Sequence, residues 1–352
     1  GTAAVFGIAS GSDQHSGPSL PFLVPFAVYV VDLSGNPVSG VNVTFTAPAS
    51  GPSGTFADTG TTTTSAITNQ DGFAIASVFT ANSQLGSYSV TAIASGLAGS
   101  VSFALTNAAW FVSPTGRDSN ICNVPSLPCL TIYGAIQKAV SGDAILVAVG
   151  TYGTVTVTKS VSILGGWNST FSSQIGTSTI DGNVTNHGIY ANAPTIFFSR
   201  FVVQNSNFGI QHTAGTLRFE RGALINNNNG FYNSGGEATL TNTTISGNDA
   251  ADTNGFGSPG SAIRNVGGFV RVHYSTITAN TGDYAVHNGN SSAHIEIGNS
   301  ILAGERPHGL LPADAHEAEP RQPDRGRAQR AAPALRQRAV RQDAVRGRGA
   351  PL

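Results

Sequence analysis

The sequence between Gly188 and Gly304 repeats with a period of about 21 residues, and each repeat places apolar residues at three fixed points. In the first three repeats these are Ile189, Ile210 and Phe231, then Ile196, Leu217 and Ala238, then Val203, Leu224 and Ile245. After an insertion near residues 249–259 the pattern resumes with Ile263, Val270 and Ile277, and again with Val286, Ile295 and Ile301. A chain built this way buries its apolar residues by stacking successive repeats, here five of them.

Each repeat contains three short runs of alternating apolar and polar residues, separated by Gly, Asn and Thr. Three strands per repeat predict a parallel β-helix, with coils stacked at about 4.8 Å. A leucine-rich repeat has a similar period, but these units lack both its leucine signature and a helical apolar period. The same residue phase carries Asn227, Asn248 and Asn280, which we interpret as a structural ladder of stacked, hydrogen-bonded side chains rather than a ligand site. We also expect Asn there because it tolerates left-handed backbone angles.

Charged residues make up only 11% of the chain, and methionine is absent. With abundant Gly, Ser, Thr and Asn, this composition is typical of extracellular β-rich proteins. The first residues lack the features of a signal peptide, so we expect a mature form or an excised segment, and no apolar run is long enough to predict a membrane-spanning helix. The two cysteines, Cys122 and Cys129, flank a proline-containing loop, and we predict a disulfide between them in preference to a metal site.

Residues 1–107 predict a β-sandwich, because five alternating runs are separated by Gly, Pro and Asn turns. The stretch from Val31 to Phe45, VDLSGNPVSGVNVTF, resembles the bacterial immunoglobulin-like repeats of invasins and intimins. TNQDGFA at 68–74 and GSYSVTA at 86–92 are similar to the same family. The resemblance implies a rigid spacer that holds another module away from a cell surface.

Residues 108–304 form the predicted β-helix domain, with a capping segment at 110–141 and coils at 142–304. The opening WFVSPTGRDSN at 110–120, LTIYGAIQKAV at 130–140 and GDAILVAVGTY at 142–152 resemble secreted pectin-lyase-like β-helix proteins. Ile132, Ile136, Ala139 and Val140 share one helix face, which predicts a short helix that caps the first coil. The predicted fold class is therefore all-β: an immunoglobulin-like β-sandwich followed by a right-handed parallel β-helix with a short N-terminal capping helix.

The last segment, residues 305–352, differs from everything before it. Ten of the 18 Lys and Arg residues lie here, and the segment contains no Ser, Thr, Asn, Ile or aromatic residue. We interpret it as disordered or as an out-of-frame translation, with a genuine basic arm as the alternative. With either interpretation, we expect the last coil to end at Gly304 without an obvious polar cap.

The outward residue of the first strand in each coil gives the candidate binding site, a predicted glycan-binding column. Its members are Tyr190, Gln211, Tyr232, Arg264 and His287. The alternative is an ordinary solvated sheet face. The second strand gives an outward column of Phe197, Arg218, Thr239, Arg271 and Glu296, with Glu220 and His273 beside it.

Carboxylates are too scarce to predict the paired acids or acidic calcium cluster of a polysaccharide-cleaving site. We therefore predict no catalytic residues and a display or adhesion function that contacts glycans or a host or neighbouring cell surface, at an extracellular or bacterial surface location. The alternatives are a carbohydrate-active enzyme of the pectin-lyase-like class and a purely structural stalk. We expect no cofactor or metal, no nucleic acid and no membrane insertion; the loop 248–254 carries oxygen ligands for calcium but without a regular spacing.

Overall fold

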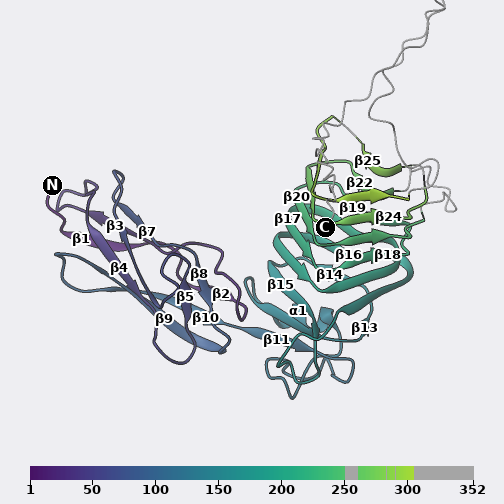
Figure 1. Cartoon of the computed structure of the whole chain (residues 1–352). Coiled ribbons are helices and arrows are strands. Elements are labelled where there is room, and N and C mark those ends of the chain that lie inside the picture. The colour runs from purple at the N-terminus through teal and green to yellow at the C-terminus, as the bar shows by residue number, and fades with distance from the viewer. Residues whose placement is uncertain (250–260, 283, 290, 305–352) are drawn as a thin grey trace, which may run out of the picture.

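The computed structural model describes residues 1–249, 261–282, 284–289 and 291–304. The chain is almost entirely β-structure (Figure 1). An N-terminal group of strands lies to one side of a tall stack of parallel strands, and the helix α1 lies at the base of that stack. Within the described residues, no helix is long and apolar enough to cross a membrane.

The N-terminal strands form a three-stranded sheet β1-β3-β7, a five-stranded sheet β2-β10-β9-β4-β6 and the pair β5-β8. Both larger sheets contribute to one core, in which the rings of Phe26 and Phe103 lie 5.1 Å apart and those of Phe56 and Phe79 lie 4.6 Å apart. Burial alternates along β4 and β10, as expected for strands with one face on a core. The strands are β1 (Val5–Ser10), β2 (Gln14–Ser16), β3 (Ala27–Val31), β4 (Asn42–Thr46), β5 (Gly54–Phe56), β6 (Thr63–Ile67), β7 (Phe73–Ile75), β8 (Phe79–Ala81), β9 (Gly86–Ala94) and β10 (Val101–Asn107).

The remaining strands form one parallel sheet that winds into a β-helix with three columns of strands. The predicted register holds in the first four repeats: Ile189 pairs with Ile210 and Ile210 with Phe231, and the other two apolar points pair in the same way. In the last repeat the third predicted point was wrong by one residue, because Ile277 pairs with Leu302, which packs against the core, whereas Ile301 is exposed. The strands are β11 (Ala109–Val112), β12 (Ala144–Ala148), β13 (Thr151–Tyr152), β14 (Val155–Val157), β15 (Val161–Trp167), β16 (Ser178–Ser199), β17 (Phe201–Glu220), β18 (Ala223–Ile225), β19 (Asn229–Asn233), β20 (Glu237–Thr241), β21 (Thr244–Ser246), β22 (Ser261–Asn265), β23 (Phe269–His273), β24 (Thr276–Thr278), β25 (Tyr284–Asn288), β26 (His294–Gly298) and β27 (Ile301–Ala303). The all-β fold with a parallel β-helix, predicted from the 21-residue period, is thus confirmed.

The helix α1 (Ile132–Lys138) closes the lower end of the β-helix core. Thr131 caps its N-terminus by accepting a hydrogen bond from the Gly134 amide at 2.9 Å. Lys159, from the next coil, donates to the carbonyls of Ile136 and Ala139 at 3.0 and 2.8 Å, which satisfies the last turn. One part of the prediction was wrong: the helix ends before Val140, whose side chain is exposed, because Ala139 adopts extended backbone angles. The predicted disulfide between Cys122 and Cys129 is present beside this helix.

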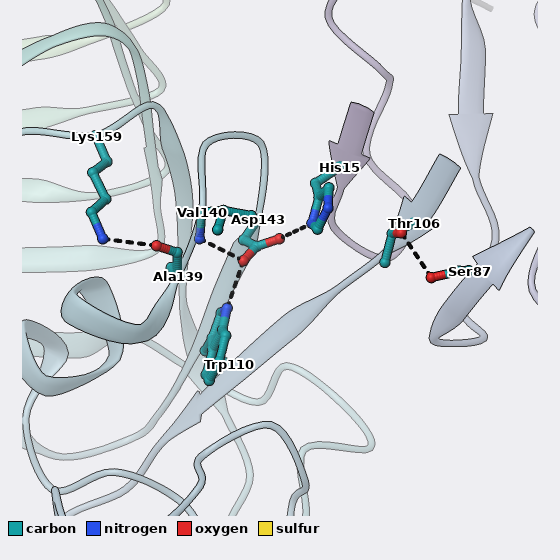
Figure 2. A network of polar contacts seen from close by, with 8 residues as sticks. All are labelled: His15, Ser87, Thr106, Trp110, Ala139, Val140, Asp143 and Lys159. Atoms are coloured by element: carbon teal, nitrogen blue, oxygen red, sulfur yellow. Dashed lines mark hydrogen bonds and ion pairs between the residues drawn. The ribbon is translucent and has the colours of Figure 1, made fainter. Parts of the chain in front are cut away.

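A buried carboxylate joins the N-terminal strands to the first coil (Figure 2). Asp143 accepts hydrogen bonds from the Trp110 indole at 2.7 Å and from the Val140 amide at 2.9 Å. Its other oxygen lies 2.7 Å from Nδ1 of His15, which belongs to β2. Because Asp143 is buried and its partners come from both sides of the junction, a rotation of one side against the other would break a charge-assisted hydrogen bond.

Candidate functional site

The five residues of the predicted binding column lie in one line along the side of the β-helix. Tyr190 pairs with Gln211 and Gln211 with Tyr232, and the line continues through Arg264 to His287. Each side chain is partly exposed, whereas the apolar residue before it is buried in the core in the first four coils. We refer to these five residues as the tyrosine column.

Two further rings extend the tyrosine column sideways, and the sequence analysis missed them. The ring of His187 lies 5.3 Å from that of Tyr190, and Phe208 lies 4.9 Å from Tyr232. Their position depends on Gly188 and its counterparts Gly209 and Gly230, since a Cβ at each would meet core atoms closer than 3.0 Å. The glycine therefore turns inward without a side chain, and the residue before it joins the outer face.

The repeated tetrapeptides contain the signal for these extra rings. They read HGIY at 187–190, FGIQ at 208–211 and NGFY at 229–232. A glycine at the same phase of three coils indicates a position where only a backbone fits, and strict alternation of faces fails there.

Buried but unsatisfied nitrogen atoms lie among these rings. The guanidinium of Arg264 lies 5.6 Å from the Tyr232 ring centre, and its Nε atom is buried without a protein hydrogen-bond partner. Nδ1 of His187 is in the same state, and burial lowers the pKa of His187. Because both nitrogen atoms are buried, a ligand on this face would meet the aromatic rings and the exposed side-chain atoms beside them.

The neighbouring outer face, formed by the second strand of each coil, has a different chemistry. Arg218 stacks on Phe197 at 5.1 Å and pairs with Glu220. Arg271 stacks on the ring of Phe269 at 4.0 Å. Arg271 also pairs with Glu237 at 3.4 Å and with Glu296 at 3.8 Å.

The glutamates in these ion pairs are the carboxylates that a polysaccharide-cleaving site on this face would use. The side chains of Glu237 and Glu296 are 59% and 52% exposed, and each lies against the same guanidinium.

Within the part of the chain that the structure describes, no group of three or more His, Cys, Asp and Glu side chains could hold a metal ion. The calcium hypothesis for residues 248–254 falls mainly outside the described residues; Asn248 itself lies in the interior.

The three predicted ladder residues, Asn227, Asn248 and Asn280, are buried and hydrogen-bonded in series. Nδ2 of Asn227 donates to Oδ1 of Asn248 at 3.1 Å, and Nδ2 of Asn248 donates to Oδ1 of Asn280 at 2.8 Å. The expectation about backbone angles was wrong by one residue. The left-handed positions are Asn226, Gly247 and Ala279, which directly precede the ladder.

A second interior ladder, which the sequence analysis did not identify, runs beneath the tyrosine column. His212 Nδ1 lies 2.7 Å from Oδ1 of Asn233, and Nδ2 of Asn233 donates to Oδ1 of Asn265 at 2.9 Å. Asn265 continues the series toward Asn288. Burial lowers the pKa of His212, whose Nε2 atom has no hydrogen-bond partner.

Comparison with known proteins gives only distant structural similarities. No family model and no curated protein sequence matches this chain. Among solved structures, a rhamnogalacturonan lyase matches with 13% identity and a TM-score of 0.32, over 55% of this chain and 62% of the lyase. The pectate lyase Pel9A matches with 14% identity and a TM-score of 0.27, over 59% of this chain and 82% of that enzyme. Domains 4 and 5 of the S-layer protein SbsC match with 16% identity and a TM-score of 0.21, over 30% of this chain and about half, 52%, of that structure.

Proposed function

We propose that this protein is an extracellular or surface-displayed glycan-binding protein. In this proposal the N-terminal region is an immunoglobulin-like spacer, and the β-helix presents the tyrosine column to saccharides on a neighbouring surface. The observation that carries the proposal is the row of partly exposed rings at Tyr190 and Tyr232, which the rings of His187 and Phe208 extend. Pyranose rings offer both an apolar face for stacking and hydroxyls for hydrogen bonds.

The proposal is tested by screening the chain on a glycan array and then measuring the affinity of the best ligand. Tyr232→Ala removes a ring that contacts both Phe208 and Arg264, so we expect about tenfold weaker binding. Tyr274→Ala is the matched control, because Tyr274 is 61% exposed and lies outside the tyrosine column. Equal effects of the two substitutions would contradict the assignment of the site to this face.

A second candidate function, cleavage of a polysaccharide, rests on the two glutamates that flank Arg271. Glycoside hydrolysis requires two carboxyl groups on either side of the scissile bond. Glu237 and Glu296 both pair with the partly exposed guanidinium of Arg271, on the outer face formed by the second strand of each coil. Incubation of the chain with polysaccharides tests this candidate: release of reducing ends that is lost in both Glu237→Gln and Glu296→Gln would support it, and intact polysaccharide would exclude it for the substrates used.

A further inference from the structure

The turn within β16 between Asp181 and Thr185 forms a corner of the β-helix, and its pairing with the next coil is irregular. A hollow lies on the surface at this corner. Gln204 and Ser206 of β17 are two residues apart, but their partners in β16, Asp181 and Thr185, are four apart. The corner therefore holds two more residues than the next coil within the stretch 182–184, and we take Asn183 and Val184, the two with left-handed backbone angles, as the extra ones. The hollow has a volume of about 480 Å³ and is lined by Thr151, Tyr152, Gly153, Asp181, Asn183, Val184 and Asn205.

The two extra residues are held in a costly conformation. Asn183 and Val184 have φ angles of +46° and +58°, in the left-handed region. A β-branched residue is a clear outlier there, and Val184 is also 89% exposed, so no burial of its side chain offsets the strain. Such strain is found most often at ligand-binding and active sites.

The carboxylate of Asp181 is fixed in the wall of the hollow. Gln204 and Asn205 donate side-chain hydrogen bonds to Oδ2 at 2.9 and 2.8 Å, and the Asn183 amide donates to Oδ1 at 2.9 Å. These hydrogen bonds lower the pKa of Asp181, and the one from Gln204 has the largest effect. Asp181 is therefore ionised at neutral pH. A carboxylate accepts about four hydrogen bonds, and these three leave capacity for one from a ligand.

A second hollow of about 440 Å³ adjoins the first and shares Thr151, Tyr152 and Gly153 with it. Its wall includes Asp118, Thr131 and the ring of Tyr133, which is 54% exposed. Among the described residues that line the two hollows, none is Lys or Arg. The surface thus offers hydroxyl, amide and carboxylate oxygens and one exposed ring. The Lys138 ammonium adjoins the second hollow, where it donates to the Asp118 carbonyl at 2.8 Å, whereas no Lys or Arg lines the first hollow around Asp181.

We propose that the two hollows form one groove, the corner groove, which binds an uncharged saccharide and excludes uronic-acid chains. Sugar hydroxyls would donate to Asp181 and to the Thr and Asn oxygens, while Tyr133 provides a stacking surface. Anionic saccharides meet an ionised carboxylate without a compensating cation, which disfavours their binding. The choice of a saccharide rests on the proposed function; the preference for an uncharged ligand follows from the groove itself.

The most direct variant removes Asn183 and Val184, which gives this corner the spacing found in the next coil. The corners of the next two coils fold with that spacing, so the deletion is expected to leave the β-helix intact, as measured by thermal unfolding. The probes are cellohexaose, galactohexaose and mannohexaose, with hexagalacturonate as an anionic probe of the same length. Affinity is measured by titration calorimetry on the full chain at low salt, and the site is located by hydrogen–deuterium exchange.

We expect at least one neutral hexasaccharide to bind more tightly than hexagalacturonate and to protect residues 151–153 and 181–184 from exchange. The deletion should weaken that binding about tenfold or more, because it removes the fixed geometry of the Asp181 wall. Asp181→Asn should reduce the difference in affinity between the neutral probe and hexagalacturonate, because the negative charge that repels hexagalacturonate is lost. Hexagalacturonate binding as tightly as the neutral probes, or full binding by the deletion variant, would overturn the proposal.

The tyrosine column is tested separately in the same assay with Tyr232→Ala. Loss of binding in this variant alone would leave the proposed function standing and refute the corner groove. Loss in the deletion variant alone would support the groove and refute the column. No binding of any neutral probe by the native chain would overturn the corner groove as a site for these sugars.

Discussion

The inner and outer columns of the first strand are adjacent in sequence but differ in the types of side chain that occupy them. The inner column runs from His212 through Asn233 to Asn265, so that each side chain bonds to the next coil. The outer column, one residue earlier, changes from Gln211 to Tyr232 to Arg264. Most buried polar groups are hydrogen-bonded, and from His212 onward the inner column contains only a histidine and amides, whereas the outer column varies in side-chain chemistry.

The largest difference should appear when a buried ladder residue is removed, and Asn248, from the ladder of Asn227, Asn248 and Asn280, makes the test. Asn248 bonds to Asn227, Asn280 and the Leu224 carbonyl, so Asn248→Ala leaves several buried groups unsatisfied. We expect a loss of about 3 kcal/mol in the free energy of unfolding, measured by urea denaturation. Gln211→Ala on the outer face is the control and should change stability by less than about 0.5 kcal/mol. A similar loss of stability in Asn248→Ala and Gln211→Ala would contradict the distinction between the buried ladder and the outer column.

The second prediction concerns pH. His212 has a lowered pKa in the folded state, so the unfolded chain binds a proton more readily. Its contribution to stability is therefore present above the unfolded pKa of 6.5 and is lost as the pH falls toward the folded pKa. We expect about 1 kcal/mol of lost stability per pH unit in this window, reduced in His212→Asn. An unchanged slope in that variant would assign the effect to other groups.

A smaller effect is expected at the corner before the ladder. Ala279 has a φ of +54°, where the preceding coils have Asn226 and Gly247. Ala279→Gly should raise stability by about 1 kcal/mol, because glycine adopts this angle without strain. Thermal unfolding measures the gain, and Ala238→Gly, inside strand β20, is the control that should destabilise instead.

The smallest effect is expected for an outer ion pair. Glu237 and Arg271 are both exposed and lie 3.4 Å apart. Glu237→Gln should change the free energy of unfolding by no more than about 0.5 kcal/mol, with no dependence on salt beyond that of the native chain. A loss comparable to that of Asn248→Ala would show that the outer face is as constrained as the interior.

The sequence predicts whatever repeats with the period and misses what interrupts it. Positions such as Ile189, Ile210 and Phe231 share one chemistry, so the register and the Asn227 ladder follow from spacing alone. The second ladder was missed because the first coils have Ala191 and then His212 at the phase where the later coils have asparagine. The corner groove was missed for the opposite reason, since two inserted residues shift the register and carry no repeated signal.

The contact between His15 and Asp143 also has a consequence for orientation. The buried carboxylate holds β2 against the first coil through a 2.7 Å contact, while Trp110 holds the same carboxylate from the connecting strand. Twisting about the junction is therefore opposed as well as bending. These contacts fix the rotation of the β-helix relative to the N-terminal strands. A partner that bound those strands would therefore also determine the direction in which the tyrosine column faces.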